Sequence, residues 1–186
     1  MTFLFLLLIS ALTQQPEQAA KAEIVEAAIY AWSSEQSAVS VSSQSTNPLV
    51  FSGGSEVAML QLGTRVPLVR QLTFGFKFHI PQLKGQYRML WQVEHPPMTT
   101  PDGRVSTGYQ EERDVFVDPF YYDMKVYQFD HPYEMVEGRW VFRYIYQGRT
   151  VLEQAFTTYQ PTAAEERKWR KKLFDAFNSS EAPAAQ

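Results

Sequence analysis

The sequence predicts an all-β fold: an antiparallel β-sandwich of about seven strands, followed by a C-terminal amphipathic α-helix. Two observations carry this prediction. Apolar residues alternate with polar ones over several short segments, which is the period of half-buried strands, and turns containing Gly or Pro separate these segments. A sustained helical period of apolar residues is found after Pro161, near the end of the chain.

Length and composition set the bounds of this fold. The chain has 186 residues, no cysteine, 15% aromatic residues and a formal net charge of −3. This length suits a single domain. The lack of cysteine excludes disulfides, thiolate zinc sites and a cysteine nucleophile. The mild acidity argues against nucleic acid as a partner, because a phosphate backbone requires a clustered basic surface.

The N-terminus predicts export. Residues 3–12 form a continuous apolar run, which is shorter than the roughly 20 residues of a bilayer span and typical of a signal peptide. Ala20-Lys21-Ala22 provides a small-x-small cleavage pattern, although no Lys or Arg precedes the apolar run. We expect residues 1–22 to be a signal peptide, cleaved after Ala22, and the protein to be periplasmic or secreted. An apolar first strand or helix of a cytosolic domain is the alternative.

The β-sandwich domain is expected over residues 23–160, and its first strand over Glu23–Trp32. Residues 33–55 are rich in serine and contain Asn-Pro and Gly-Gly pairs, with neither the helical nor the strand period. They predict a long Ser-rich loop. One short strand, Ala38–Val41, can be accommodated within it.

The middle of the chain has the strongest strand pattern. Residues 72–80 place five apolar side chains on one face, and residues 86–94 repeat the alternation. His95-Pro96-Pro97 is expected to end the second strand, because proline cannot donate to a central ladder. A type I turn over residues 100–104, closed by a left-handed glycine, then leads into a polar strand over Val105–Val117.

Three further strands complete the predicted sandwich. Residues 120–129 are rich in aromatic residues and follow the strand-breaking Asp118-Pro119 pair. Residues 140–146 alternate aromatic side chains on one face, and a tight Gln-Gly turn connects them to a returning strand over residues 150–159.

The helix predicted over residues 161–178 begins at a capping box formed by Thr162 and Glu165. Its basic residues outnumber its acidic ones, so peripheral contact with a membrane is possible, with packing on the domain as the alternative. Residues 179–186 are expected to be a disordered tail. One helix face carries four apolar residues, Trp169, Leu173, Ala176 and Phe177.

Two histidines precede prolines at predicted strand ends. His95 and His131 would share a metal with Asp130 and Asp118 only if these ends met, and no two histidines have the usual ligand spacing. Each histidine is more simply explained by a turn or an aromatic stack. The carboxylates at positions 111–123 are distributed by strand alternation over both faces, unlike a glycosidase pair. We therefore predict a non-enzyme without metal or cofactor, and keep a metal-dependent or hydrolytic protein using His95, His131 and nearby carboxylates as the alternative.

Several tyrosines exceed what the predicted core requires. They would form a strip that binds sugar or peptide, or else cover a sheet face. We accordingly expect an interaction module with a protein or glycan partner in the envelope, and keep as an alternative a peripheral envelope assembly component that uses the C-terminal helix. The candidate binding residues are Tyr109, Tyr121, Tyr122, Tyr127 and Tyr133.

Several motifs resemble a bacterial family, domain of unknown function 3859. They are the segment His95-Pro96-Pro97-Met98 with its Pro-Asp-Gly turn, residues 130–134, and the hairpin from Glu137 to Phe156 with its Gly-x-Trp-x-Phe and Gly-Arg-x-x-Leu motifs. The resemblance covers roughly residues 23–160. It implies an immunoglobulin-like β-sandwich, commonly exported, with no established activity or catalytic residue. The Ser-rich segment and the C-terminal helix depart from the short family domain.

Overall fold

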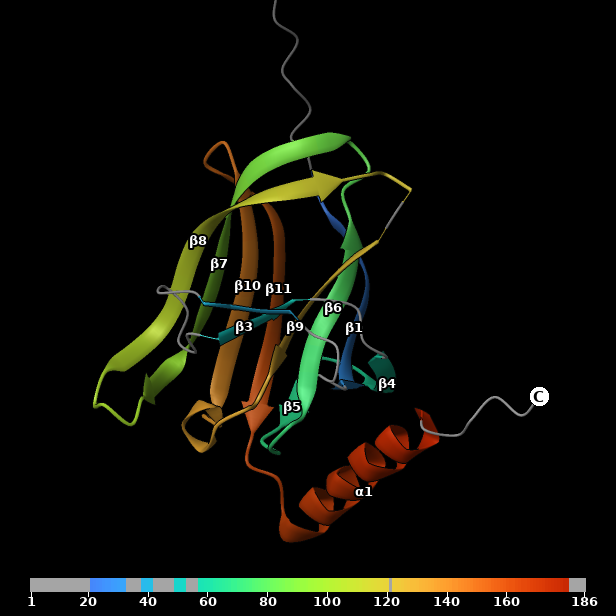
Figure 1. The fold of residues 1–186 in the computed structure, drawn as a ribbon, viewed down its shortest axis with the longest axis vertical. Helices are drawn as coiled ribbons and strands as arrows, with labels where there is room; N and C mark the ends of the chain where they lie inside the picture. The colour runs from blue at the N-terminus through green and yellow to red at the C-terminus, as the bar shows by residue number, and fades with distance from the viewer. Residues whose placement is uncertain (1–20, 33–37, 42–48, 53–56, 121, 181–186) are drawn as a thin grey trace, which may run out of the picture.

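The structure is a computed structural model that describes residues 21–32, 38–41, 49–52, 57–120 and 122–180. Within these residues, nine strands form two packed sheets, one of four strands and one of five. Figure 1 shows the two layers, with the C-terminal helix below them. The predicted β-sandwich with a C-terminal helix is confirmed, and its two main sheets hold nine strands where about seven were predicted.

The four-stranded sheet has the order β4-β1-β6-β9, and its strands are antiparallel. β6 pairs with β9 so closely at Gly75 that a Cβ atom there would lie 2.0 Å from the Lys125 carbonyl oxygen. Glycine is therefore required at this position. The strands are β4 (Val57–Leu62), β1 (Glu23–Trp32), β6 (Thr73–His79) and β9 (Asp123–Gln128).

The five-stranded sheet has the order β5-β11-β10-β7-β8, in which only the short β5 runs parallel to its neighbour. The turn between β7 and β8 is the predicted one: the Gly103 N–H donates to the Thr100 carbonyl at 2.8 Å, and Gly103 has a φ of +82°. The strands are β5 (Arg65–Pro67), β11 (Arg149–Tyr159), β10 (Gly138–Tyr146), β7 (Gly85–Thr99) and β8 (Val105–Val117).

One predicted strand end is wrong. β7 continues through His95-Pro96-Pro97 to Thr99. The pairing of β7 with β8 shifts register between Glu94 and Met98. A bulge of this kind leaves residues outside the ladder, so the prolines have no hydrogen bond to donate there.

The Ser-rich segment is also more structured than predicted. The short strand β2 (Ala38–Val41) is present, and it pairs with a second strand, β3 (Leu49–Ser52), in a separate two-stranded sheet. β3 was not predicted, because its three consecutive apolar residues and one serine give no measurable alternation. The rest of residues 33–55 lies outside the described residues, as do residues 1–20 and 181–186.

Aromatic side chains fill the space between the two sheets. Phe74 on β6 lies at their centre, with its ring 5.5 Å from that of Trp140 and 5.2 Å from that of Phe156. These rings come from facing sheets, so their edge-on contacts hold the two layers together. Further rings in contact with Phe74 belong to Tyr127, Phe129 and Phe142.

The helix α1 (Ala163–Ser180) begins at the predicted capping box, in which the Glu165 carboxylate accepts the Thr162 N–H at 2.8 Å. Trp169 and Leu173 are buried, and α1 contacts β1 and β4. None of the helices within the described ranges combines the length and the apolar character needed to cross a bilayer.

Candidate functional site

β8 and β9 are edge strands of opposite sheets, and both lie on the same side of the sandwich. Residues that face inward along these strands face the gap between the sheets, because they share a face with buried neighbours such as Trp91 on β7 and Phe76 on β6. We call this row the β8–β9 seam. It consists of Tyr109, Glu111 and Arg113 on β8 and Asp123, Lys125 and Tyr127 on β9.

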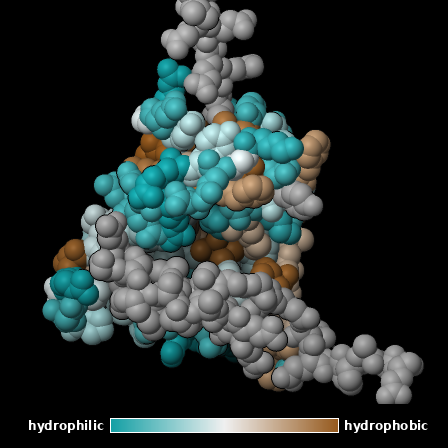
Figure 2. All heavy atoms as spheres, turned by 45° about the horizontal axis from the view of Figure 1, so that its top comes forward, coloured by the Kyte–Doolittle hydropathy of each residue, from teal (hydrophilic) through white to brown (hydrophobic). Residues whose placement is uncertain are grey.

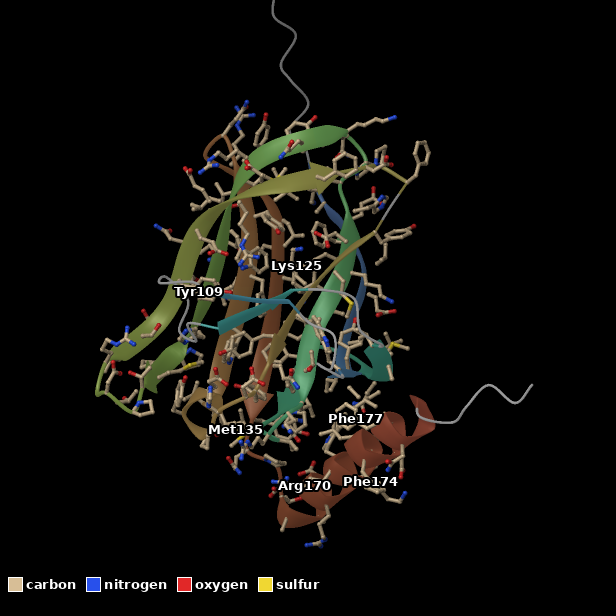
Figure 3. All side chains as sticks on the ribbon, viewed as in Figure 1. Tyr109, Lys125, Met135, Arg170, Phe174 and Phe177 are labelled. Carbon is tan, nitrogen blue, oxygen red and sulfur yellow. The ribbon has the colours of Figure 1, made fainter. Side chains whose placement is uncertain are left out.

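The middle of the seam is charged, although it faces the interior. Arg113 pairs with Glu111 on its own strand, and the Lys125 Nζ lies 2.7 Å from an Asp123 carboxylate oxygen. The Lys125 Nζ also lies 6.0 Å from the ring centroid of Tyr144 on the opposite sheet. Burial, and then the carboxylate of Asp123, raise the pKa of Tyr144. Figure 3 shows Tyr109 and Lys125 on either side of this gap.

Inward-pointing charges on an edge strand oppose the addition of another strand, because pairing would seal them away from water. Arg113 and Lys125 retain 33% and 23% side-chain exposure, which shows that water reaches the middle of the seam. The seam therefore keeps both edges solvated and leaves the gap between the sheets open on this side.

One end of the seam, which we call the open end, contains a pocket of about 230 Å³. Buried core residues, including Phe78 and Val115, line it, and Asp118 and Asp123 add two carboxylates. Two of its lining side chains are largely exposed: Phe116 is 71% exposed and Tyr122 61%. Phe120, which is 81% exposed, lies in the connection between β8 and β9. Figure 2 shows hydrophobic residues in the middle of a largely hydrophilic face.

His79 supports the open end. Its ring centroid lies 5.1 Å from that of Tyr122, and its Nε2 lies 3.1 Å from a Glu23 carboxylate oxygen. Its Nδ1 lies 3.4 Å from the carbonyl oxygen of Pro119, in the connection between β8 and β9. His79 thus links β1 and β6 to the segment that carries the exposed aromatic residues.

The other end, which we call the closed end, surrounds the buried carboxylate of Glu134 in the 3₁₀-helix η1 (Pro132–Glu134). The N–H groups of Asp130 and His131 each donate to Glu134 Oε2 at 2.7 Å, and the Tyr127 hydroxyl donates to Oε1 at 3.2 Å. Burial raises the pKa of Glu134, while the hydrogen bond from the His131 backbone opposes this shift. These contacts satisfy the carboxylate and fix η1.

The four residues weighed as metal ligands are not brought together. His95 is buried, with its ring centroid 5.0 Å from that of Trp140, and His131 stacks on Tyr133 at 5.2 Å. The Asp118 carboxylate accepts the Phe120 N–H at 2.8 Å. Across the part of the chain that the structure describes, no three His, Asp or Glu side chains are placed to hold one ion. The structure therefore does not place these residues as one metal site, and the two histidines pack against aromatic rings.

The five candidate tyrosines do not form one strip. Tyr109 and Tyr127 pack against the core near the closed end, and the Trp91 indole N–H lies 3.4 Å from the Tyr109 hydroxyl. Tyr133 lies nearby, and burial, followed by the charge of Glu134, raises the pKa of Tyr127 well above its ordinary value. Tyr122 lies apart from them at the open end. Tyr121 lies outside the described residues.

Sequence reasoning missed Phe116 and Phe120. Phe116 has a recognisable signal, because it follows Gln110, Glu112 and Asp114 on the outward face of β8. An aromatic residue in phase with polar ones indicates an exposed apolar side chain. Phe120 was included in a predicted strand, but it lies before β9, in the connection from β8.

Comparisons with known proteins show the family of the chain and the class of its fold. The family model described as Domain of unknown function (DUF3859) matches residues 20–158. An immunoglobulin-like protein from Pseudomonas aeruginosa is similar in structure, with a TM-score of 0.50 and 20% identity over 76% of this chain and 99% of that chain. This likeness shows an immunoglobulin-like fold and nothing more.

A second solved structure, of the alkylpurine DNA glycosylase AlkC from Pseudomonas fluorescens bound to DNA, has a TM-score of 0.31 and 8% identity. The match covers 51% of this chain and 27% of that chain, and it carries no argument. No curated protein sequence matches the chain.

Proposed function

Because the chain belongs to the family described as Domain of unknown function 3859, which brings no established reaction with it, we propose from its geometry that it is a non-catalytic binding module. The open end of the β8–β9 seam receives an apolar side chain of a partner protein. One observation carries this proposal: Phe116 and Tyr122, both largely exposed, line a pocket that reaches core residues. Exposed aromatic clusters beside a pocket are characteristic of interaction sites.

The lining favours a protein segment over a glycan. A sugar requires several converging hydrogen-bond donors and acceptors, whereas apolar and aromatic side chains, among them Phe78, Ile80 and Val117, form most of this pocket. Its carboxylates belong to Asp118 and Asp123. We infer that the preferred segment carries a phenylalanine or leucine next to a lysine or arginine.

A non-catalytic role agrees with the titratable groups along the seam. Arg113 and Lys125 are held by carboxylates on their own strands, and Glu134 is satisfied by three donors. Burial raises the pKa of the Tyr109 hydroxyl, which makes it a poorer nucleophile. These groups have the arrangement of structural contacts and not of a nucleophile with its base.

Two synthetic ten-residue peptides test this function. Both carry a central phenylalanine, flanked by lysines in one and by glutamates in the other, and binding is followed by ¹⁵N–¹H NMR spectroscopy. We expect the lysine peptide to shift the amide signals of Val115, Val117 and Asp123, and the double variant Phe116→Ser/Tyr122→Ser to weaken binding at least about fivefold.

Val105→Ser provides the matched control, because Val105 is a 65% exposed apolar residue at the far end of the same strand. The control should bind like the wild type. The proposal is wrong if neither peptide shifts these signals, or if the double variant and the control behave alike.

We also propose that the protein works outside the cytoplasm. The apolar run at residues 3–12 and the pattern Ala20-Lys21-Ala22 support export, and the lack of cysteine makes folding independent of disulfide formation. The Ala22 N–H donates to the Val151 carbonyl at 2.6 Å, so cleavage after Ala22 would remove this contact. Cell fractionation with mass spectrometry of the purified N-terminus tests both points. Recovery of the uncleaved chain from the cytoplasm would contradict them.

A further inference from the structure

The helix α1 has two faces with different chemistry. Its inner face packs on the sandwich through Trp169 and Leu173, and Phe177 adds to the same contact. Lys172 also belongs to this side, since its Nζ lies 3.2 Å from the Gln61 side-chain oxygen and 4.3 Å from the Trp169 ring centroid. The packing of α1 on β1 and β4 is therefore complete without the outer face.

The outer face combines an exposed phenylalanine with cations. Phe174 is 66% exposed. Arg167, Arg170 and Lys171 precede it by seven, four and three residues, a spacing that places them on the same side of a helix. Figure 3 shows Phe174 on the side of α1 that points away from the sheets, and Phe177 on the side that faces them.

The charges of this face remain available to a partner. Arg170 pairs with Glu166 and Lys171 with Asp175, each at 2.7 Å, but exposed pairs of this kind are weak and readily exchanged. Within the described ranges, Arg167 forms no ion pair.

Charge is divided unevenly between the helix and the rest of the chain. Residues 163–180 contain five Lys and Arg against three Asp and Glu, a net charge of +2. Residues 1–162 contain twelve against sixteen, a net charge of −4. An anionic surface would therefore attract the helix and repel the sandwich, which orients the molecule with the outer face of α1 toward that surface.

We propose that this outer face, formed by Arg167, Arg170, Lys171 and Phe174, docks on the surface of an anionic lipid bilayer. The cations contact the lipid phosphates, and the Phe174 ring enters the boundary between headgroups and acyl chains. This is the arrangement of an amphipathic helix that lies in the membrane interface without crossing it. The site is separate from the open end of the β8–β9 seam, and either can exist without the other.

The lack of native cysteine allows a direct test in the full chain, because a cysteine introduced at one position is the sole labelling site. Asn178→Cys, one turn beyond Phe174, carries a nitrobenzoxadiazole dye whose emission rises and shifts to the blue on leaving water. A matched protein carries the dye at Gln110→Cys on the outward face of β8. Any binding through residues 1–22 is common to both proteins, so the difference between the labels reports on α1.

We expect vesicles containing phosphatidylglycerol to raise the emission of the label at position 178, and pure phosphatidylcholine vesicles to leave it unchanged. The response should weaken at least about tenfold between about 0.05 and 0.5 M salt, as screening shortens the reach of the charges. The triple variant Arg167→Gln/Lys171→Gln/Phe174→Ser should lose the response while keeping the wild-type circular dichroism spectrum, because all three side chains are exposed.

Four outcomes would overturn the proposal. One is an absence of any response to phosphatidylglycerol, and another is a response of the folded triple variant equal to that of the wild type. The third is an equal response to duplex DNA at the same phosphate concentration, which would identify the partner as a general polyanion. An equal rise in emission at position 110 would place the contact away from α1 and contradict it as well.

Discussion

The two ends of the β8–β9 seam hold aromatic residues in opposite states. At the closed end, the rings of Tyr127 and His95 pack against that of Trp140, and the buried carboxylate of Glu134 has three donors. At the open end, Phe116 and Tyr122 stand in solvent beside a pocket. Aromatic residues in this chain thus have two different roles. Those at the closed end hold the sheets together, and those at the open end are available for binding.

The largest effect should come from the core beside the closed end. Phe74 is fully buried and contacts rings from both sheets, including Trp140 and Phe156. Phe74→Ala removes these contacts and leaves a cavity, so we expect the free energy of unfolding to fall by about 3–5 kcal/mol. Urea denaturation followed by circular dichroism measures this. A loss of less than about 1 kcal/mol would show that the sandwich closes around the cavity.

Glu134→Ala should have the next largest effect. It leaves the N–H groups of Asp130 and His131 without their acceptor, at about 1–3 kcal/mol for each group. Both lie in partly buried positions, so we expect a total loss of about 2–4 kcal/mol.

Glu134→Gln is the matched control, because its carbonyl oxygen still accepts both bonds. Burial raises the pKa of Glu134 in the folded state, so its ionised form costs stability as the pH rises above the ordinary value of 4.5. Glutamine removes this cost and should match or slightly exceed the wild type at pH 7. Equal stability of the alanine and glutamine variants would contradict the role of the carboxylate.

Much of this fold could be predicted from alternation alone. The strands Glu23–Trp32 and Val105–Val117 have the predicted bounds, because side chains of period 2 follow burial directly. β4 and β5 were not predicted. Most of β4 is exposed on both faces, and β5 has three residues held by parallel pairing with β11, so neither shows a periodic pattern.

The candidate site was harder to predict than the fold. Alternation distributes the carboxylates of β8 over two faces, and the structure agrees: Glu111 points inward while Glu112 is exposed. The sequence does not reveal that β8 and β9 are edge strands, and therefore that inward charges such as Arg113 still reach water. Strand order is a long-range property, and period 2 carries no information about it.

His95 gives the closed end a dependence on pH. Burial lowers the pKa of His95 below its ordinary value of 6.5, with a weaker opposing effect from the Pro96 carbonyl. As the pH falls through 6.5, the unfolded chain takes up this proton before the folded protein does. This group therefore removes stability on acidification. We expect the unfolding free energy of the wild type to fall more steeply than that of His95→Gln between about pH 7 and pH 5.5, measured by urea denaturation. Parallel profiles would show that His95 titrates alike in both states.

The smallest effect on stability is expected at the open end, where the comparison is sharpest. Phe116 is as large as Phe74, but it is 71% exposed and leaves the core intact when it is truncated. We expect Phe116→Ser to change the free energy of unfolding by less than about 0.5 kcal/mol, as at other exposed sites. A surface phenylalanine costs solubility, so the same substitution should also delay aggregation on concentration, measured by light scattering. A loss of stability comparable to that of Phe74→Ala would mean that Phe116 belongs to the core. β8 would then provide no exposed aromatic residue for a partner at the open end.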